Sequence, residues 1–235
     1  MKNSLYQDTD IYKCLKFKNE KEWLKGRSVG IGGSSASSLV NKNPWQDLVS
    51  LWEEKKGIRI PEDISDKPAV MYGKKAEKYI RGLFELDYLK YEVQYLDNVT
   101  LQNKEIPWMM YSPDGLLIEK ETGRKGILEI KTTNIMRSMQ REEWKDSVPI
   151  NYYIQVLHGL LVTNFDFVEL RAQLKSEWKL DDGTKETRIQ VKDYHIERSE
   201  ALSDLEWLLS EEETNYKRYF VGNEVPNTNL EKFLR

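Results

Sequence analysis

The hydrophobic period of this chain changes from that of a helix to that of a strand near residue 90. Residues 70–89 have strong helical character, whereas five short segments between residues 91 and 133 alternate apolar and polar positions. Residues 150–163 return to a helical period, and a strand pair then precedes a final amphipathic helix over residues 199–221. This order predicts an α/β or α+β fold in which helices flank a mixed central β-sheet. The apolar stripe of the helix over 150–163 comprises Ile150, Ile154, Leu157 and Leu161.

The chain of 235 residues is expected to form a single domain. No internal repeat, low-complexity tract or long Gly/Ser/Pro linker divides it. We expect N-terminal helices within residues 18–57, a catalytic core over 68–175, and a C-terminal hairpin and helix over 176–235.

Glycines mark the boundaries of the N-terminal helices. A short helix over residues 18–26 is predicted to end at Gly26, and a later one is predicted to end at Gly57. Between them, the run RSVGIGGSSASSLV predicts a Gly/Ser turn that opens into a short helix. Its glycines, its hydroxyls and Arg27 are typical of an anion-binding nest, although a serine N-cap after a glycine turn would explain everything except Arg27.

Charge and cysteine content restrict the classes of partner and metal. The 36 Lys and Arg against 39 Asp and Glu give a net charge of −3, so any contact with DNA would need a local groove. The single Cys14 excludes an intrachain disulfide and a four-Cys metal site, and two histidines argue against a His-rich zinc centre. A bound metal should therefore be a hard cation on carboxylates. No apolar run long enough to cross a bilayer and no apolar signal region are visible, so neither a membrane span nor secretion is expected.

The segments SPDGLLIEK and GILEIKTT carry the strongest chemical signal. Side chains alternate along a strand, so Glu129 and Lys131 should project from one face while Leu128 and Ile130 project from the other. The intervening turn can bring Asp114 towards Glu129. Two carboxylates beside a lysine suit a Mg²⁺ site, in which the lysine orients a water or stabilises developing phosphorane charge. The alternative is a cross-strand salt bridge with no catalytic role.

Two helical residues are further candidates. Glu77 shares a helix face with Gly73 and apolar residues, so its carboxylate could serve a metal; an i,i+4 pair with Arg81 on a solvated helix is the alternative. Gln155 lies off the main apolar stripe of its helix, where an amide could bridge a water or phosphate oxygen to the site, although on spacing alone an ordinary polar helix residue is the better explanation. His158 is expected to be a hydrogen-bonded packing residue.

Taken in order, these motifs resemble a known family. The runs WLKGRSVGIGGSSAS, NPWQDLVSLWEEKKG, YGKKAEKYI, SPDGLL, LEIKTT and YYIQVLHGLLVTN, from about Trp23 to Asn164, are similar to those of the YqaJ-type viral recombinase family. This family is the lambda exonuclease-like branch of the PD-(D/E)xK nucleases, so the resemblance implies their restriction-endonuclease-like core. It further implies a Mg²⁺-dependent exonuclease, with Mn²⁺ as a substitute, that digests one strand of linear duplex DNA from the 5′ end.

The resemblance also implies how such an enzyme works in its cell. It implies a homotrimeric ring that acts on double-stranded DNA ends and leaves 3′ single strands for a single-strand annealing protein in phage recombination. The expected location is the cytoplasm of a bacterial host, with the gene carried by a phage or prophage.

Carried over residue by residue, the resemblance assigns seven site residues. It implies that Asp114, Glu129 and Glu77 contribute to the metal site, that Lys131 is the catalytic lysine and that Gln155 lies near the nucleophilic water. Arg27 and Ser34 fall where the family binds the 5′ phosphate. Ser35 departs from the Asp that many members carry after Gly-Gly-Ser. Two other functions remain open: a structure- or sequence-specific endonuclease on the same core, and a non-catalytic DNA-binding module.

Overall fold

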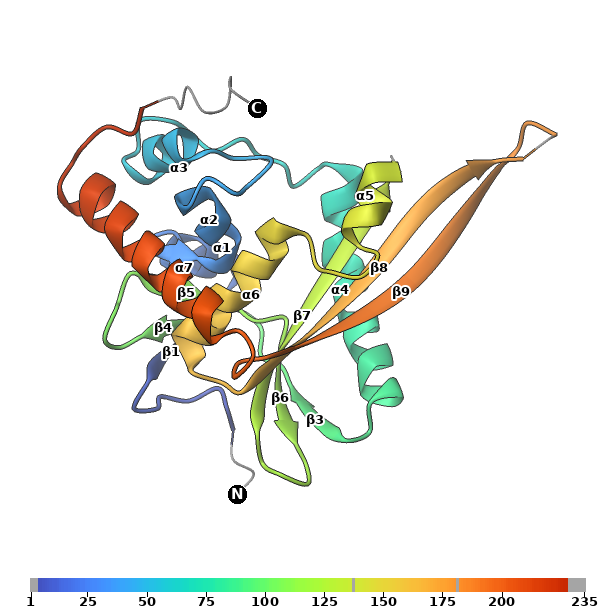
Figure 1. Cartoon of the computed structure of the whole chain (residues 1–235), viewed down its shortest axis with the longest axis horizontal. Helices are drawn as coiled ribbons and strands as arrows, with labels where there is room; N and C mark the ends of the chain where they lie inside the picture. The colour runs from blue at the N-terminus through green and yellow to red at the C-terminus, as the bar shows by residue number, and fades with distance from the viewer. Residues whose placement is uncertain (1–3, 137, 181, 228–235) are drawn as a thin grey trace.

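The computed structural model describes residues 4–136, 138–180 and 182–227. Its strands form two mixed sheets, with helices packed on both (Figure 1). The four-stranded sheet has the order β1-β4-β5-β2 and the five-stranded sheet the order β3-β6-β7-β8-β9. Each sheet contains one parallel pair, β2–β5 and β7–β8 respectively, and is otherwise antiparallel. The strands are β1 Tyr12–Lys16, β2 Ile31–Gly32, β3 Tyr91–Gln94, β4 Val99–Asn103, β5 Met109–Tyr111, β6 Gly115–Glu119, β7 Lys125–Ile135, β8 Phe167–Lys179 and β9 Lys185–Glu197.

Helices cover both faces of β7. On one face α4 packs over a small apolar cluster that includes Ile80, Phe84 and Leu128; on the other face α6 packs into the main core. Strands β8 and β9 continue past the body as a two-stranded arm (Figure 1). The helices are α1 Glu20–Arg27, α2 Gly33–Leu39, α3 Leu48–Lys55, α4 Pro68–Asp87, α5 Ser138–Glu143, α6 Ile150–Thr163 and α7 Leu202–Asn215, and the π-helix η1 spans Tyr216–Val221. None of the described helices is long and apolar enough to cross a bilayer.

Several sequence predictions need correction. The first helix continues past Gly26 to Arg27, and Gly26 instead makes a tertiary contact: a Cβ there would lie 2.2 Å from the Phe17 ring, so that ring would have to move. Ile150 does not join the apolar stripe of α6 but is 54% exposed at the start of the helix. The helix predicted over 199–221 is divided between α7 and η1. Sequence periodicity also missed the short elements β1, β2 and α5, which are stabilised by their neighbours rather than by a period of their own.

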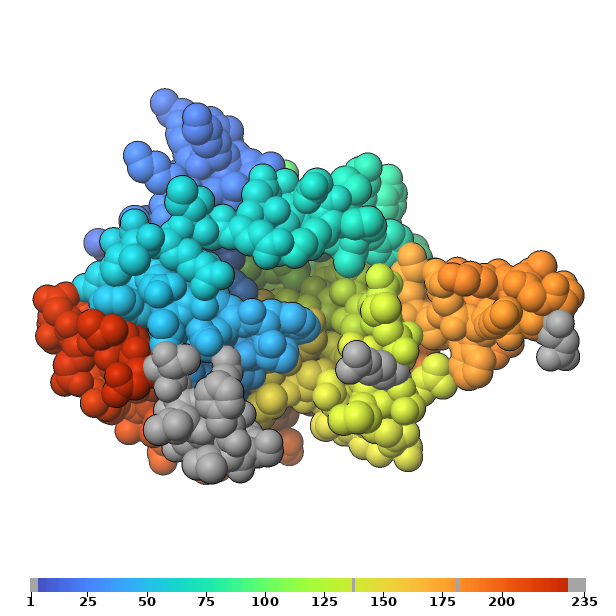
Figure 2. Space-filling view, turned by 90° about the horizontal axis from the view of Figure 1, so that it is seen from above, coloured from blue at the N-terminus to red at the C-terminus, as the bar shows by residue number. Residues whose placement is uncertain are grey.

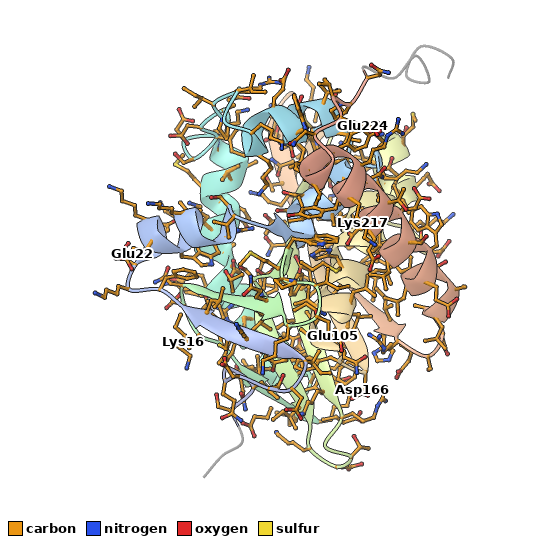
Figure 3. The ribbon with its side chains drawn as sticks, turned by 90° about the vertical axis from the view of Figure 1, so that its left-hand side faces the viewer. Lys16, Glu22, Glu105, Asp166, Lys217 and Glu224 are labelled. Carbon is orange, nitrogen blue, oxygen red and sulfur yellow. The ribbon has the colours of Figure 1, made fainter. Side chains whose placement is uncertain are left out.

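The C-terminal segment is fixed to the body by a buried ion pair. Figure 3 shows α1, with Glu22, at one margin of the molecule and the C-terminal helical segment, with Lys217, at the other. His158 of α6 contacts both carboxylate oxygens of Glu212 of α7 through Nδ1, each at 2.9 Å. Its Nε2 lies 3.1 Å from the Met110 carbonyl, and both His158 and Glu212 are fully buried. His158 is therefore a hydrogen-bonded packing residue, as expected, and both of its ring nitrogens face acceptors, one of them the Glu212 carboxylate.

We predict that Glu212→Gln destabilises the protein in a pH-dependent manner. Burial opposes the charge on His158, but Glu212 more than compensates, so the pKa of His158 is raised above its ordinary value. A histidine whose pKa is raised on folding contributes its full stabilisation below its pKa in the unfolded chain, which is near 6.5. This stabilisation is lost as the pH rises through the pKa in the folded protein. Urea unfolding at acidic pH should show a loss of about 3 kcal/mol, shrinking as pH increases.

The neighbouring Glu213→Gln is the matched control. Glu213 pairs with the exposed Lys217 one helical turn away, so its loss should cost about 0.5 kcal/mol or less. Equal losses in the two variants, or a loss in Glu212→Gln that grows at alkaline pH, would contradict the role of the buried pair.

Candidate active site

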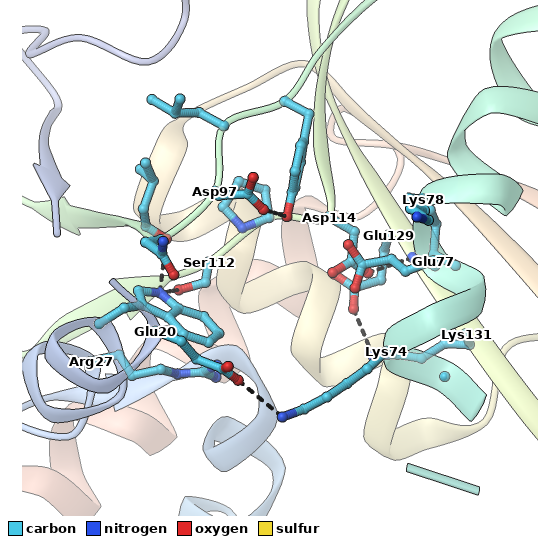
Figure 4. A pocket seen from close by; sticks show the side chains of 18 of the residues that line it. Glu20, Arg27, Lys74, Glu77, Lys78, Asp97, Ser112, Asp114, Glu129 and Lys131 are labelled. Atoms are coloured by element: carbon cyan, nitrogen blue, oxygen red, sulfur yellow. Dashed lines mark hydrogen bonds and ion pairs between the residues drawn. The ribbon is translucent and has the colours of Figure 1, made fainter. Parts of the chain in front are cut away.

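Six of the seven predicted site residues line one cavity of about 600 Å³ (Figure 4). The cavity lies between α1, α4 and α6, next to the turn that joins β5 to β6 and to the central part of β7. Residues far apart in the sequence therefore meet at one place. The six residues are Arg27, Glu77, Asp114, Glu129, Lys131 and Gln155.

Strand β7 presents its charged pair as the alternation predicted. Glu129 and Lys131 lie on one face, where Lys131 Nζ contacts Glu129 Oε1 at 2.6 Å. Leu128 and Ile130 pack on the other face, beneath α4. Glu129 is only 1% exposed although it carries a carboxylate. Burial would lower the pKa of Lys131, but Glu129 and then Asp114 raise it, so the ammonium stays charged.

Gln155 joins this pair from α6. Its Nε2 donates to Glu129 Oε1 at 2.6 Å, and its Oε1 accepts from Lys131 Nζ at 3.0 Å. The amide thus holds the carboxylate and the ammonium in one orientation, which an ordinary polar helix residue would not do. Tyr111 of β5 donates its hydroxyl to Glu129 Oε2. Both oxygens of Glu129 therefore have partners.

Asp114 lies in the turn before β6, and the hairpin brings its carboxylate back to β7. Its Oδ2 accepts from the backbone N–H of Ile130 at 2.8 Å. The pKa of Asp114 is raised well above its ordinary value, first by burial and then by the negative charges of Glu129 and Glu77. Lys131 and the Ile130 N–H act in the opposite direction. Asp114 is therefore a buried carboxyl with two other carboxylates beside it.

Glu77 makes the i,i+4 contact that was considered as an alternative. Its Oε1 accepts from Arg81 Nη1 at 3.0 Å. The surroundings differ from that alternative, however, because Arg81 is 8% exposed rather than solvated, and it also donates to the backbone carbonyl of Asp114. The guanidinium centre lies 3.4 Å from the centroid of the Tyr95 ring. Arg81 therefore fixes both Glu77 and the turn that carries Asp114.

The donor set fits a hard divalent cation, but the side chains are not arranged around one. Glu77, Asp114 and Glu129 offer carboxylate oxygens to the same cavity, and these are the ligands that Mg²⁺ prefers. In the part of the chain that the structure describes, no three His, Cys, Asp or Glu side chains converge on a common metal position. Glu129 is held by Lys131 and Gln155, and Glu77 by Arg81. Coordination by all three would require these partners to shift.

The N-terminal nest reaches the cavity through Arg27 alone. Arg27 lines the cavity, and its guanidinium centre lies 4.6 Å from the centroid of the Trp23 ring. Burial lowers its pKa, whereas the charges of Asp114 and Glu129 oppose this shift. Its Nη2 also lies 3.9 Å from where a Cβ on Gly32 would be, at the start of α2. Ser34 is exposed and does not line the cavity.

Sequence reasoning missed Tyr111 and Arg81. Tyr111 lies three residues before Asp114 in a buried strand, and a buried tyrosine hydroxyl requires a partner, so its position was a usable signal. The Tyr111 ring also packs directly against Gly159, where a Cβ would lie only 2.8 Å from the ring. Arg81 was considered only as a partner of Glu77, because nothing in a helical period reveals a contact with a distant backbone carbonyl.

Comparisons with known sequences match most of the chain. Residues 22–166 match the model of the YqaJ-like viral recombinase domain. The uncharacterized protein YqaJ of Bacillus subtilis (strain 168) is 33% identical over 140 residues, which are 59% of this chain and 41% of YqaJ. The chain thus spans about two fifths of that relative's length.

Solved structures share the fold at low sequence identity. The alkaline exonuclease LHK-Exo from Laribacter hongkongensis superposes with a TM-score of 0.55 at 18% identity, covering 86% of this chain and 97% of that one. LHK-Exo in complex with dAMP gives 0.52 at 17% identity, covering 87% and 100%. These superpositions confirm the predicted α+β fold, in which helices flank mixed β-sheet. Because the domain model matches more than half of the residues, the chain belongs to the YqaJ-like viral recombinase domain family.

Proposed function

We propose that this protein is a metal-dependent deoxyribonuclease that digests linear duplex DNA from its 5′ ends and leaves 3′ single strands. The observation that carries the proposal is the bonded group of Glu129, Lys131 and Gln155 next to Asp114 in one cavity. Family membership and the fold shared with a protein named an alkaline exonuclease support the same conclusion. A purely structural salt bridge would need neither the Gln155 contact nor an adjacent cavity.

The roles follow from the positions of the polar atoms. Lys131 Nζ can orient an attacking water and stabilise the charge that develops on the phosphoryl oxygens. Gln155 keeps that ammonium and the Glu129 carboxylate in register, and Asp114, Glu129 and Glu77 would hold the metal. When bound, Mg²⁺, or Mn²⁺ in its place, supplies charge neutralisation and a more acidic water.

We assign the 5′ phosphate to Arg27, with Ser34 at the rim of its site. Arg27 lies in the same cavity as Asp114 and Lys131, and a guanidinium can bind a terminal phosphate through two parallel hydrogen bonds. Ser34 is in the first turn of α2, which begins beside Arg27. A terminal phosphate held there would place the adjoining phosphodiester near Lys131, which is the basis for 5′-to-3′ polarity.

The assembly and cellular setting belong to the same proposal. A protein with a net charge of −3 can hold duplex DNA by enclosing it, which favours a homotrimeric ring. The 3′ single strand would pass to an annealing protein during phage-type recombination in the cytoplasm of a bacterial host. An endonuclease on the same core is the second candidate, and the substrate test below separates the two.

We predict Mg²⁺-dependent degradation of a linear duplex whose two strands carry different end labels. The 5′ label should be released first, and a closed circular duplex should stay intact. Lys131→Ala should reduce the rate by about 10²- to 10³-fold while DNA binding survives, since it removes charge stabilisation of the transition state. Lys125→Ala, an exposed lysine on the same strand, is the matched control and should retain activity. Cleavage of the circle would favour the endonuclease, and full activity of Lys131→Ala would refute the assignment.

A second prediction concerns the end chemistry. Duplexes with 5′-phosphate ends should be degraded faster than the same duplexes with 5′-hydroxyl ends, because the phosphate gains charge-assisted hydrogen bonds that a hydroxyl cannot make. Arg27→Ala should abolish this preference, and higher salt should weaken it in the wild type. The exposed Lys25→Ala, on the same helix, serves as the control and should keep the preference. A wild-type enzyme indifferent to end chemistry would exclude the phosphate site.

A further inference from the structure

A second cavity of about 730 Å³ adjoins the candidate active site and has a different lining. It lies between the loop that joins α2 to α3 and the segment that contains α5 and the start of α6. Figure 2 shows this face hollowed between the blue segment that holds α2 and α3 and the yellow-green segment that holds α5. Its charged lining residues, Lys42 and Glu143, have opposite signs, so the cavity does not select for phosphate. Its other lining residues comprise three aromatic rings, four amides, two hydroxyls and the aliphatic Pro44, Val148, Pro149 and Ile150.

Three aromatic rings follow one another along this cavity. Trp45 lies 5.9 Å from Tyr152, and Tyr152 lies 5.4 Å from Trp144, measured between ring centroids. Trp144 is buried, whereas Trp45 is 71% exposed. An indole this exposed offers a large flat surface to a ligand.

The loop holds Trp45 in place. Asn43 Oδ1 accepts from the backbone N–H of Trp45 at 2.8 Å and from that of Gln46 at 3.2 Å. This Asx turn fixes the backbone on both sides of the indole. A pre-positioned ring loses little conformational freedom when a ligand stacks on it.

Strand β7 connects the second cavity to the candidate active site. Glu129, Lys131 and Thr133 are every second residue of the strand, so their side chains lie on one face. Thr133 lines the second cavity, about 7 Å along the strand from Lys131. Lys131 Nζ lies 5.0 Å from the centroid of the Tyr152 ring, so Tyr152 separates the two cavities. The hydroxyl of Thr133 is buried and makes no hydrogen bond within residues 4–136, 138–180 and 182–227. A ligand that enters the cavity and displaces the atoms covering this hydroxyl would give it the hydrogen-bond partner that it lacks.

We propose that this second cavity binds a nucleobase of the DNA strand next to the phosphate being cut, with Trp45 as its stacking surface. This inference rests on the proposed nuclease function and adds a binding site to it. A nucleobase combines the two features that the cavity accommodates, a flat π-face for Trp45 and polar edges for Thr133. An acidic or basic peptide would lack charge complementarity here, and an apolar side chain would leave the Thr133 hydroxyl unpaired.

The test measures binding of a short blunt duplex with 5′-phosphate ends in Ca²⁺ without Mg²⁺, by fluorescence anisotropy. Trp45→Ala should weaken binding about ten-fold, the size of one lost base–aromatic stack, and Trp45→Phe should retain most of the affinity. Trp207→Ala is the control, because Trp207 is also exposed, at 44%, but lies on α7. Its affinity should stay within about two-fold of wild type, as for an ordinary surface substitution.

A protein–DNA double-mutant cycle identifies the contact. Duplexes that lack one base, at each of the first positions from the 5′ end, are tested with the wild type and with Trp45→Ala. At the position that stacks, the missing base should weaken wild-type binding about ten-fold and should weaken binding by Trp45→Ala no further. Penalties that add at every position, or equal losses in Trp45→Ala and Trp207→Ala, would overturn the base site.

The outcome can be separated from the test of the nuclease function. Binding that depends on Trp45 without any cleavage in Mg²⁺ would support the base site and reject hydrolysis. Cleavage by the wild type with Trp45→Ala unaffected in binding would reject the base site and leave hydrolysis in place, as expected if a protein occupies the cavity instead. A wild-type protein that does not bind the duplex would reject both.

Discussion

Repulsion among three buried or half-buried carboxylates is the constraint on which the site depends. Asp114, Glu129 and Glu77 line one cavity, and burial together with the charges of the last two raises the pKa of the first. Such crowding is tolerated only because positive and donor groups surround it. Each comes from a different element: Lys131 from β7, Gln155 from α6, Tyr111 from β5 and Arg81 from α4. The packing of both sheets with α4 and α6 is therefore what makes the cluster stable.

Strand β7 organises the functional face. Its Leu128 and Ile130 fix α4 on one side, and its Glu129, Lys131 and Thr133 face α6 and the two cavities on the other. A DNA strand that follows this face would meet the charged groups first and then the aromatic rings beyond Tyr152. Hydrolysis and base recognition would thus use alternate residues of one strand, with a fixed spacing between them.

Local sequence patterns predicted what depends on neighbouring residues. Alternation placed Glu129 and Lys131 on one face, and the resemblance to a family placed Gln155 beside them. Contacts across the fold could not be predicted in this way. Gly26 was interpreted as a helix cap, since its tertiary contact with Phe17 leaves no local sequence pattern. Glu212 was not singled out, because the amphipathic pattern of its helix does not reveal the buried contact with His158. The resemblance to the family grouped Ser34 with Arg27, but only Arg27 lines the cavity, since α2 leaves Ser34 on the surface.

The central claim is that the carboxylate cluster exists to bind a divalent cation, and calorimetric titration of Ca²⁺ into the metal-free protein tests it most directly. Wild type and Lys131→Ala should bind the ion. Asp114→Ala should not bind it, because this substitution removes a ligand, while the other groups of the cavity stay in place. Asp97→Ala is the matched control: Asp97 lines the same cavity but its carboxylate accepts from Tyr95, so binding should persist. A wild-type protein that binds no divalent cation, or an Asp114→Ala variant that binds as tightly as wild type, would contradict the account.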